Sequence, residues 1–244
     1  MQETDEIPEW MGRTQLLLGN EALHKLRAAK VMVVGLGGVG GIAAEMIARA
    51  GVGHLTIIDA DVVEASNRNR QVIALASTNQ LQKATVLADR LRDINPEIDL
   101  QVINDFVLRS NMGTWLSSQK FDYVADCFDT LTPKVMFIKY CWENKIPLVS
   151  SMGAGGRLDP SQVKISDISK TFNCYLAYYV RKKLHKHGIY KGVTTVSSEE
   201  LPAKRGIEIQ HGRNKKSVIG TMSYMPNIFG CLIASVVIRG ILKK

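Results

Sequence analysis

Short apolar runs alternate with segments of helical spacing between residues 31 and 151. The run from Val31 to Val34 lies between a lysine and a glycine, which is typical of a buried parallel strand. The next segment carries apolar side chains at helical spacing and predicts a helix from Val39 to Ala50. The same patterns predict strands at 55–58, 100–103, 123–125 and 146–151 and helices at 81–94 and 133–142. Such alternation predicts an α/β fold with a Rossmann-like, doubly wound and mainly parallel sheet.

The pattern becomes irregular after Gly153. A glycine-rich turn at 153–156 precedes a predicted strand at 162–165 and a predicted helix at 172–184. Residues 188–216 are polar, basic and rich in turn formers, which predicts a loop or hairpin. We therefore expect one domain over residues 1–244, whose second half extends the sheet in a partly antiparallel way and supplies the surface that binds a partner.

An uncharged stretch near the C-terminus, residues 217–238, resembles a membrane span in composition. Pro226 and Asn227 interrupt it, and the apolar part that follows is shorter than the roughly 20 residues that a bilayer requires. We expect a helix buried against the sheet and no stable membrane insertion.

Charge and cysteine content restrict the classes of partner and compartment. Lysine and arginine exceed aspartate and glutamate by 8, and residues 181–216 hold ten basic and three acidic side chains, or seven of those eight charges. Such a segment suits a polyanionic partner. The four cysteines form no CxxC pair, and the acidic N-terminus has no apolar leader. We expect no structural zinc, no disulfide framework and a cytoplasmic location.

A glycine-rich turn follows the first predicted strand and opens the first predicted helix. Its sequence is Gly35-Leu-Gly37-Gly38-Val-Gly40-Gly41, and glycines at these places let nucleotide phosphates approach the backbone and the helix N-terminus. Asp59 ends the second predicted strand, 24 residues after Gly35, where a carboxylate can accept hydrogen bonds from ribose. These features alone do not separate NAD from ATP.

The charged residues that follow favour a triphosphate. The run 59–71 contains Asp61, Asn67, Arg68 and Arg70, and Lys83 comes at the next helix. Nicotinamide needs an uncharged surface, whereas transfer of a nucleotidyl group needs cations beside the phosphates. Asp129, in Asp-Cys-Phe-Asp after the fourth predicted strand, can hold Mg²⁺ together with phosphate oxygens.

These motifs together resemble a known superfamily. GLGGVGG, IIDADVVEASNRNRQ and DCFD are similar to motifs of the ubiquitin-activating-enzyme-like (ThiF-type) adenylyltransferases, over roughly residues 13–165. KIPLVSSMGAGG at 145–156, Asp159-Pro160 and YMPNIFG at 224–230 resemble the tRNA threonylcarbamoyladenosine dehydratases, a family within that superfamily.

The resemblance implies an ATP-dependent dehydration, by cyclisation, of the N6-threonylcarbamoyladenosine that lies beside the anticodon of tRNA, through adenylation of its carboxylate. It implies an ATP-binding half at 13–152 and a half at 153–244 for tRNA binding and dimerisation. The roles carried over are phosphate contacts at Gly35, Gly37, Gly38 and Gly40, ribose binding by Asp59, organisation by Asp61, triphosphate binding by Asn67, Arg70 and Lys83, and Mg²⁺ binding by Asp129.

Further partners follow from the same resemblance. Arg13 resembles an N-terminal arginine that reaches the partner subunit's site, which implies a homodimer with Arg13, Arg70, Lys83 and Asp129 as catalytic residues. Sulfur-relay proteins and a monovalent cation near 153–156 are left open. We expect the basic stretch 181–216 to be the main tRNA contact, with Tyr178, Tyr179 and Tyr190 as stacking partners.

Two alternatives remain at this point. One is activation of the C-terminal glycine of a sulfur-carrier protein, and the other is a scaffold that binds nucleotide without turnover. The missing zinc cysteines count against the first. Thr194 stands where some relatives carry a cysteine after Gly-Val, which excludes a thioester at that place. The presence of Arg70, Lys83 and Asp129 together counts against the second.

Overall fold

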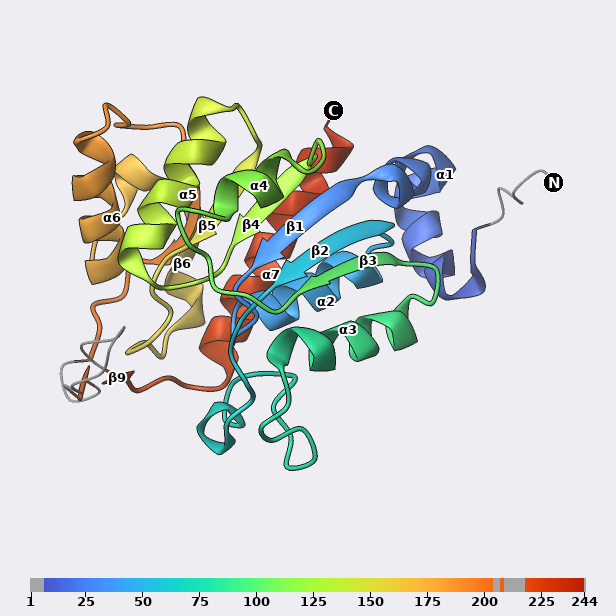
Figure 1. The fold of residues 1–244 in the computed structure, drawn as a ribbon, viewed down its shortest axis with the longest axis horizontal. Helices are drawn as coiled ribbons and strands as arrows, with labels where there is room; N and C mark the ends of the chain where they lie inside the picture. Colours follow the sequence, from blue (N-terminus) through green and yellow to red (C-terminus); the bar gives the residue numbers. More distant parts are fainter. Residues whose placement is uncertain (1–6, 204–206, 209–217, 244) are drawn as a thin grey trace.

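A seven-stranded sheet with the order β3-β2-β1-β4-β5-β7-β6 forms the centre of the molecule in the computed structural model (Figure 1). The structure describes residues 7–203, 207–208 and 218–243. The strands of this sheet are β1 (Lys30–Val34), β2 (His54–Ile58), β3 (Asp99–Ile103), β4 (Tyr123–Asp126), β5 (Leu148–Ser151), β6 (Val163–Asp167) and β7 (Thr194–Ser198). The α-helices are α1 (Gly12–Ala28), α2 (Gly40–Arg49), α3 (Lys83–Ile94), α4 (Met112–Ser117), α5 (Leu131–Glu143), α6 (Tyr175–His185) and α7 (Tyr224–Leu242).

Every strand pair in this sheet is parallel except β6 with β7. Val33 is paired with Ile57 on one side and Ala125 on the other, which places β1 in the middle of the nucleotide-binding part. The predicted α/β class, the parallel order and the partly antiparallel C-terminal half are confirmed.

Helices cover both faces of the sheet because the strand residues alternate in direction. Val31 and Val33 of β1 pack into a buried cluster with α2, α3 and α7. Met32 and Val34 pack into a second cluster with α4 and α5 on the opposite face. A third cluster joins α5 to α6. The sheet is therefore buried on both faces, as a doubly wound fold requires.

The interpretation of 188–216 as only a loop or hairpin was wrong for its first part. Residues Thr194–Ser198 form β7, an inner strand between β5 and β6, and Val196 is fully buried. The threonine and serine residues of β7 count as polar in a sequence pattern, so the pattern does not indicate their burial. The buried Oγ1 of Thr195 is satisfied because it donates to the carbonyl of Ser166 at 2.9 Å. The short strands β8 (Ile207–Glu208) and β9 (Val218–Ile219) do form an antiparallel pair.

The C-terminal helix begins earlier than its sequence suggests. Helix α7 starts at Tyr224, so Pro226 and Asn227 lie in its first turn and do not interrupt it. Proline is tolerated there because the first N–H groups of a helix have no intrahelical acceptor. Among the described residues, α7 is the one helix long and apolar enough to span a membrane, and it packs against α2, β4 and β5. The predicted buried helix is confirmed.

Candidate active site

The carboxyl ends of β1, β2 and β4 meet at one edge of the sheet and carry most of the predicted site residues. Gly35 follows β1, and its backbone N–H donates to the carbonyl of Ile58 at the end of β2 at 2.9 Å. Cys127 follows β4 and donates in the same way to Val34 at 2.8 Å. Strand order reverses at β1, and such a reversal is where ligands bind in open α/β sheets.

The positions of the turn differ in the structural reason for which they require glycine. Gly35 adopts φ +83°, and a Cβ atom there would lie 2.8 Å from Phe128. A Cβ at Gly40 would overlap the carbonyl of Gly35, and one at Gly38 would lie 2.9 Å from Pro226 of α7. Gly37 is open, with the Gln71 amide 3.7 Å from the Cβ position. The turn is thus tightly packed at Gly35, Gly38 and Gly40, and a ligand can approach it at Gly37.

Helix α2 begins directly at this turn without a side-chain cap. The first N–H groups of a helix carry partial positive charge and need acceptors from outside the helix. Phosphate oxygens are suitable acceptors at such an N-terminus. The open Gly37 and the uncapped α2 together make a surface that fits a nucleotide phosphate.

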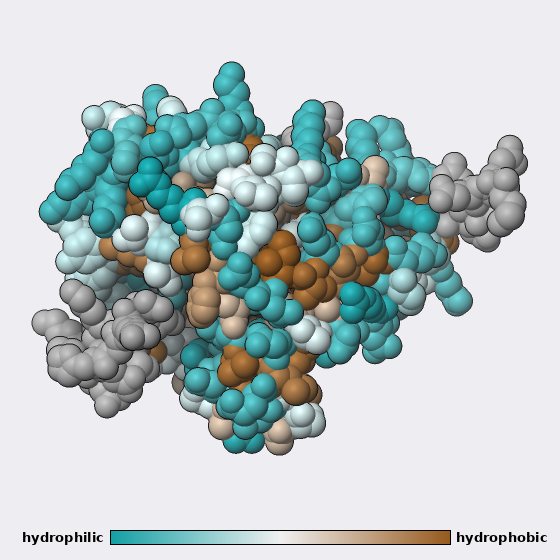
Figure 2. All heavy atoms as spheres, in the orientation of Figure 1, coloured by the Kyte–Doolittle hydropathy of each residue, from teal (hydrophilic) through white to brown (hydrophobic). Residues whose placement is uncertain are grey.

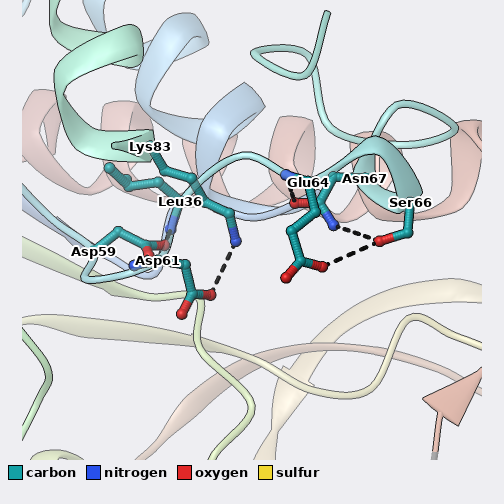
Figure 3. A network of polar contacts seen from close by, with 7 residues as sticks. All are labelled: Leu36, Asp59, Asp61, Glu64, Ser66, Asn67 and Lys83. Atoms are coloured by element: carbon teal, nitrogen blue, oxygen red, sulfur yellow. Dashed lines mark hydrogen bonds and ion pairs between the residues drawn. The ribbon is translucent and has the colours of Figure 1, made fainter. Parts of the chain in front are cut away.

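Asp59 fixes the shape of this turn from the neighbouring strand. Its Oδ2 accepts a hydrogen bond from the Leu36 N–H at 2.6 Å, and its Oδ1 accepts one from the Asp61 N–H at 2.8 Å (Figure 3). Burial raises the pKa of this carboxyl, whereas the Lys83 ammonium and the two backbone donors oppose the rise. An ionised carboxylate has further lone pairs beyond these two bonds, so ribose hydroxyls can still donate to it.

Lys83 is held at the same edge by Asp61. Its Nζ lies 2.9 Å from Asp61 Oδ2, and its side chain is 7% exposed against 59% for Asp61 (Figure 3). The backbone N–H of Lys83 also donates to the Asp61 carbonyl at 3.0 Å. The ammonium is therefore positioned before any ligand arrives, and a phosphate would compete with an exposed carboxylate for it.

Asn67 and Arg70 lie in the connection from β2 to α3. Asn67 is buried, and its Oδ1 accepts from the Glu64 N–H at 3.2 Å within a capping box (Figure 3). The Arg70 guanidinium donates to the Ser66 carbonyl at 3.0 Å and to Asn69 Oδ1 at 2.7 Å. The Arg70 carbonyl lies 3.3 Å from the Cβ position of Gly38. The backbone of Arg70 thus adjoins the glycine turn, while its guanidinium is engaged in its own loop.

Asp129 is exposed in the turn between β4 and α5. The preceding Phe128 contacts Gly35. Its carbonyl is held by Lys134, whose Nζ donates to it at 2.8 Å. Lys134 also lies 2.8 Å from Asp126, and both side chains are fully buried. The Ser150 hydroxyl donates to Asp126 at 2.6 Å. A buried ion pair therefore supports the loop that carries Asp129.

Arg13 does not join these residues within its own chain. It is exposed on α1, two residues after Met11, which packs against Gly51 beside the beginning of β2. The amino ends of the parallel strands lie at the opposite edge of the sheet from the glycine turn (Figure 1). A role for Arg13 in catalysis therefore requires a second chain.

Sequence reasoning missed two side chains beside the glycine turn. Within the described residues, Gln71 Oε1 and Asn227 Oδ1 are buried and have no hydrogen-bond partner. The Asn227 amide donates to the Arg70 carbonyl at 3.5 Å and to the Ser223 carbonyl at 2.6 Å. Their unpaired oxygens can accept from a bound ligand or from water. Asn227 approaches Arg70 from 157 residues away, a distance that no local pattern reveals.

In the part of the chain that the structure describes, the cysteines and acidic residues give no preformed metal centre. No group of three or more His, Cys, Asp or Glu side chains could hold a metal ion within residues 7–203, 207–208 and 218–243. Burial, followed by the nearby Asp126 charge, raises the pKa of the Cys127 and Cys141 thiols. A thiolate nucleophile at either cysteine is therefore disfavoured at neutral pH.

The sequence matches the ThiF family over residues 12–244. The chain belongs to the ThiF family. Within the family, it is 36% identical to the tRNA threonylcarbamoyladenosine dehydratase of Bacillus subtilis, covering 95% of this chain and 94% of that protein. It is 45% identical to the same-named protein of Escherichia coli, over 74% of this chain and 67% of that protein.

A solved structure of a relative has a closely similar fold. The crystal structure of the E. coli tRNA N6-threonylcarbamoyladenosine dehydratase in complex with ATP matches with a TM-score of 0.89 at 37% identity. The match covers 96% of this chain and 94% of that one. The likeness therefore includes the second half, where the sequence pattern is irregular.

Proposed function

We propose that this ThiF-family chain is an ATP-dependent tRNA threonylcarbamoyladenosine dehydratase. The observation that carries the proposal is the nearly full-length likeness to dehydratases, combined with a phosphate-accepting edge formed by the glycine turn and Lys83. The substrate is the N6-threonylcarbamoyl group of a tRNA adenosine, and the product is its cyclised form.

The reaction needs activation of a carboxylate, because the ionised group is a poor electrophile at neutral pH. A carboxylate oxygen attacks the α-phosphorus of ATP, and pyrophosphate leaves. A nitrogen or oxygen of the tethered carbamoyl group then attacks the acyl carbon, and AMP leaves with the former carboxylate oxygen. The second step is intramolecular, so proximity supplies much of its rate. A site without a reactive thiol suits this chemistry.

The residues of the chain act by positioning and charge. Gly37 and the first turn of α2 hold phosphate oxygens, Gly35, Gly38 and Gly40 keep the turn closely packed, and Asp59 accepts from ribose. Lys83 stabilises charge on the triphosphate once the phosphate displaces Asp61 from the ammonium. Asn67 and Arg70 contribute in the same way once the phosphate replaces the contacts that these side chains make within their own loop. Such preorganised contacts typically lower the barrier most where charge develops.

Asp129 is the proposed ligand for Mg²⁺. Mg²⁺ commonly takes one or two carboxylates and completes its shell with substrate phosphates and water. A single exposed carboxylate at the phosphate edge, without a preformed acidic cluster among the described residues, fits that pattern. Bound there, the ion would neutralise phosphate charge.

The same proposal includes a homodimer. Helix α1 exposes Leu16 and Leu17, at 90% and 82%, and the connection from β2 to α3 exposes Leu75 and Leu81. Figure 2 shows brown, hydrophobic surface over this connection, at the bottom of the molecule. A two-fold dimer that lays α1 of each chain on the connection of the other would cover both surfaces and bring Arg13 to the phosphate edge.

The remaining assignments belong to the proposal as well. The half at 13–152 binds ATP and the half at 153–244 binds tRNA. A location in the cytoplasm suits a tRNA-modifying enzyme with free cysteines. Neither sulfur-relay partners nor a monovalent cation near 153–156 has a specific observation in its favour.

One experiment separates the proposed function from its alternatives. Purified protein is incubated with ATP and Mg²⁺ and with tRNA carrying N6-threonylcarbamoyladenosine, with a sulfur-carrier protein, or with neither. AMP and pyrophosphate are measured, and the tRNA nucleosides are analysed by mass spectrometry. We expect loss of one water mass from the modified nucleoside only in the first reaction. AMP formation with the carrier protein alone would support carrier activation, and nucleotide binding without any turnover would support a scaffold.

A further inference from the structure

Helix α6 has one buried face and one exposed face of unusual composition. Ala177, Val180 and Leu184 are fully buried against α5 and neighbouring loops. The residues at helical spacings i, i+3, i+4, i+7, i+8 and i+11 from the start of the helix form the opposite face. We call these six the tyrosine–lysine face: Tyr175, Tyr178, Tyr179, Lys182, Lys183 and Lys186.

The tyrosines of this face are half to two-thirds exposed to solvent. Tyr175 is 67% exposed, and Tyr178 and Tyr179 are each 49% exposed. The Tyr178 and Tyr179 ring centroids lie 5.2 Å apart with an interplanar angle of 74°. Beyond the helix, exposed Tyr190 lies 5.0 Å from the His185 ring. Exposed aromatic rings of this density are a feature of binding surfaces more than of solvated helices.

The face is also free of negative charge along the chain. No aspartate or glutamate occurs between Ile168 and Ser198, a segment that contains five lysines and one arginine. Figure 2 shows mostly teal, hydrophilic surface at the upper left, where α5 and α6 lie in Figure 1. A second copy of the basic face would repel it, whereas a polyanion would be attracted.

The order of residues along α6 relates the face to the active-site edge. The helix begins next to Gly153, which follows β5, because Cys174 Sγ lies 3.5 Å from the Gly153 Cβ position. Strand β5 is parallel to β4, so Gly153 lies at the same sheet edge as the turn before α5. The tyrosines are therefore nearer this edge, and the lysines lie farther along the helix.

The structure reduces the number of basic side chains in 181–216 that are available to bind RNA. Arg181 is engaged internally and donates to the carbonyls of Ile168 and Thr171. Residues 194–198 are a buried strand. Lys204, Arg205, Arg213, Lys215 and Lys216 lie outside the described residues. The lysines that remain available in the described part lie mainly on α6.

We propose that the tyrosine–lysine face of α6 binds single-stranded RNA in the anticodon loop, with the tyrosines stacking on unpaired bases and the lysines contacting phosphates. The inference rests on the proposed function for its partner class. Stacking on aromatic rings is the usual way in which proteins hold unpaired RNA bases. In this arrangement the lysines would contact phosphates of the loop farther from the carboxyl ends of the strands. The tyrosines would hold unpaired bases nearer to those ends.

Binding of an anticodon stem-loop RNA, measured by fluorescence anisotropy over a range of KCl concentrations, tests the inference. We expect Tyr178→Ala/Tyr179→Ala to weaken binding by about 5- to 150-fold for each base that no longer stacks, with an unchanged salt slope. Tyr178→Phe/Tyr179→Phe keeps both rings and should restore binding. Lys182→Ala/Lys183→Ala/Lys186→Ala should lower the salt slope by about 0.7–0.9 for each phosphate that a lysine no longer neutralises.

A charge-matched control removes lysines elsewhere. Lys25→Ala/Lys120→Ala/Lys243→Ala should leave the slope unchanged. Normal RNA affinity in both the tyrosine-to-alanine and the lysine-to-alanine variants of α6, or an equal weakening in the control, overturns the inference, as does a change of oligomeric state in sedimentation. Wild-type turnover of modified tRNA is measured in parallel. Turnover with normal binding by the α6 variants refutes only this surface, whereas absence of turnover by the wild type refutes the proposed function.

Discussion

Lys83 and Asp129 carry opposite charges at the same edge of the sheet, yet only Lys83 is buried. The two proposed contacts with the nucleotide therefore differ: the Lys83 ammonium is already fixed beside Asp61, and the Asp129 carboxylate stands in an exposed turn. We expect Lys83→Ala and Asp129→Ala each to reduce AMP formation by about 10²–10³-fold, because each removes a charge that acts on the transition state. Single-turnover AMP release, with circular dichroism as the control for folding, measures this. Near-normal turnover in either folded variant would refute the assignment.

The buried pair of Lys134 and Asp126 has a structural consequence for the same site. Removal of one partner leaves an unpaired buried charge, so we expect Lys134→Met to lower the free energy of unfolding by about 3–5 kcal/mol. The matched double variant Asp126→Asn/Lys134→Met lacks the stranded charge and should recover part of that stability. Urea denaturation measures both. An equal or larger destabilisation in the double variant would show that the charge pair is not the cause.

The positions of the candidate site residues that follow strand ends could be predicted from the sequence, whereas the neighbours that long-range packing brings to the site could not. Asp59 and the glycine turn follow strands directly, so their convergence at one edge comes from the parallel order alone. Lys134 lies on the apolar face of α5, and only its helical spacing with Phe137, Ile138 and Cys141 signals its burial. Gln71 and Asn227 meet the turn through long-range packing that no local pattern contains.

At the scale of single elements, two segments were misjudged for two different physical reasons. The sequence of β7 is mostly threonine and serine, and the hydrophobic pattern therefore underrates a strand that both neighbours bury. The first turn of α7 contains a proline. The rule that proline interrupts a helix applies to helix interiors, so using it here placed the start of α7 too late in the sequence. Strands β1 to β6 and helices α2, α3, α5 and α6 were predicted within a few residues because burial determines their patterns, whereas helices α1 and α4 were not predicted.

Helices α2 and α3 are joined by a carboxylate that only the fold reveals. Glu45 of α2 is buried, and it accepts hydrogen bonds from Arg90 of α3 at 2.7 and 3.1 Å and from Arg49 at 2.9 Å. Burial alone would raise the pKa of Glu45, but the two arginines outweigh it and lower the pKa below its ordinary value. A lowered folded-state pKa means that ionised Glu45 stabilises the fold above the unfolded-state pKa, about 4.3.

This arrangement predicts a pH-dependent difference between two proteins. We expect Glu45→Gln to lower the free energy of unfolding by about 1–2 kcal/mol near neutral pH, since both arginines are about half exposed and solvent screens them. The difference from wild type should shrink as pH falls below about 4.3 and through the lower folded-state pKa. Chemical denaturation at several pH values measures it. A difference that grows toward acid would contradict the sign of the pKa shift.

At the scale of the whole molecule, the order of the sheet explains why Arg13 could be proposed from the sequence but not placed by it. The parallel strands carry the glycine turn and Lys83 to one edge, and α1 remains at the other end of the strands (Figure 1). A single chain therefore holds an incomplete set of the proposed catalytic residues. The exposed leucines of α1 and of the β2–α3 connection give the second chain a surface to cover.

Mixing two inactive variants tests whether each site takes Arg13 from its neighbour. In a mixed dimer of Arg13→Ala and Lys83→Ala chains, the site on the Arg13→Ala chain keeps its own Lys83 and receives Arg13 from the other chain. Random exchange makes half of all dimers mixed, so about one quarter of the wild-type AMP formation should return. A mixture of Lys83→Ala and Asp129→Ala chains is the matched control, because both residues belong to the site of their own chain and no mixed dimer restores it. Recovery in the first mixture alone establishes a shared site. No recovery after verified subunit exchange, or sedimentation of the active protein as a monomer, would mean that Arg13 takes no part in a neighbouring site.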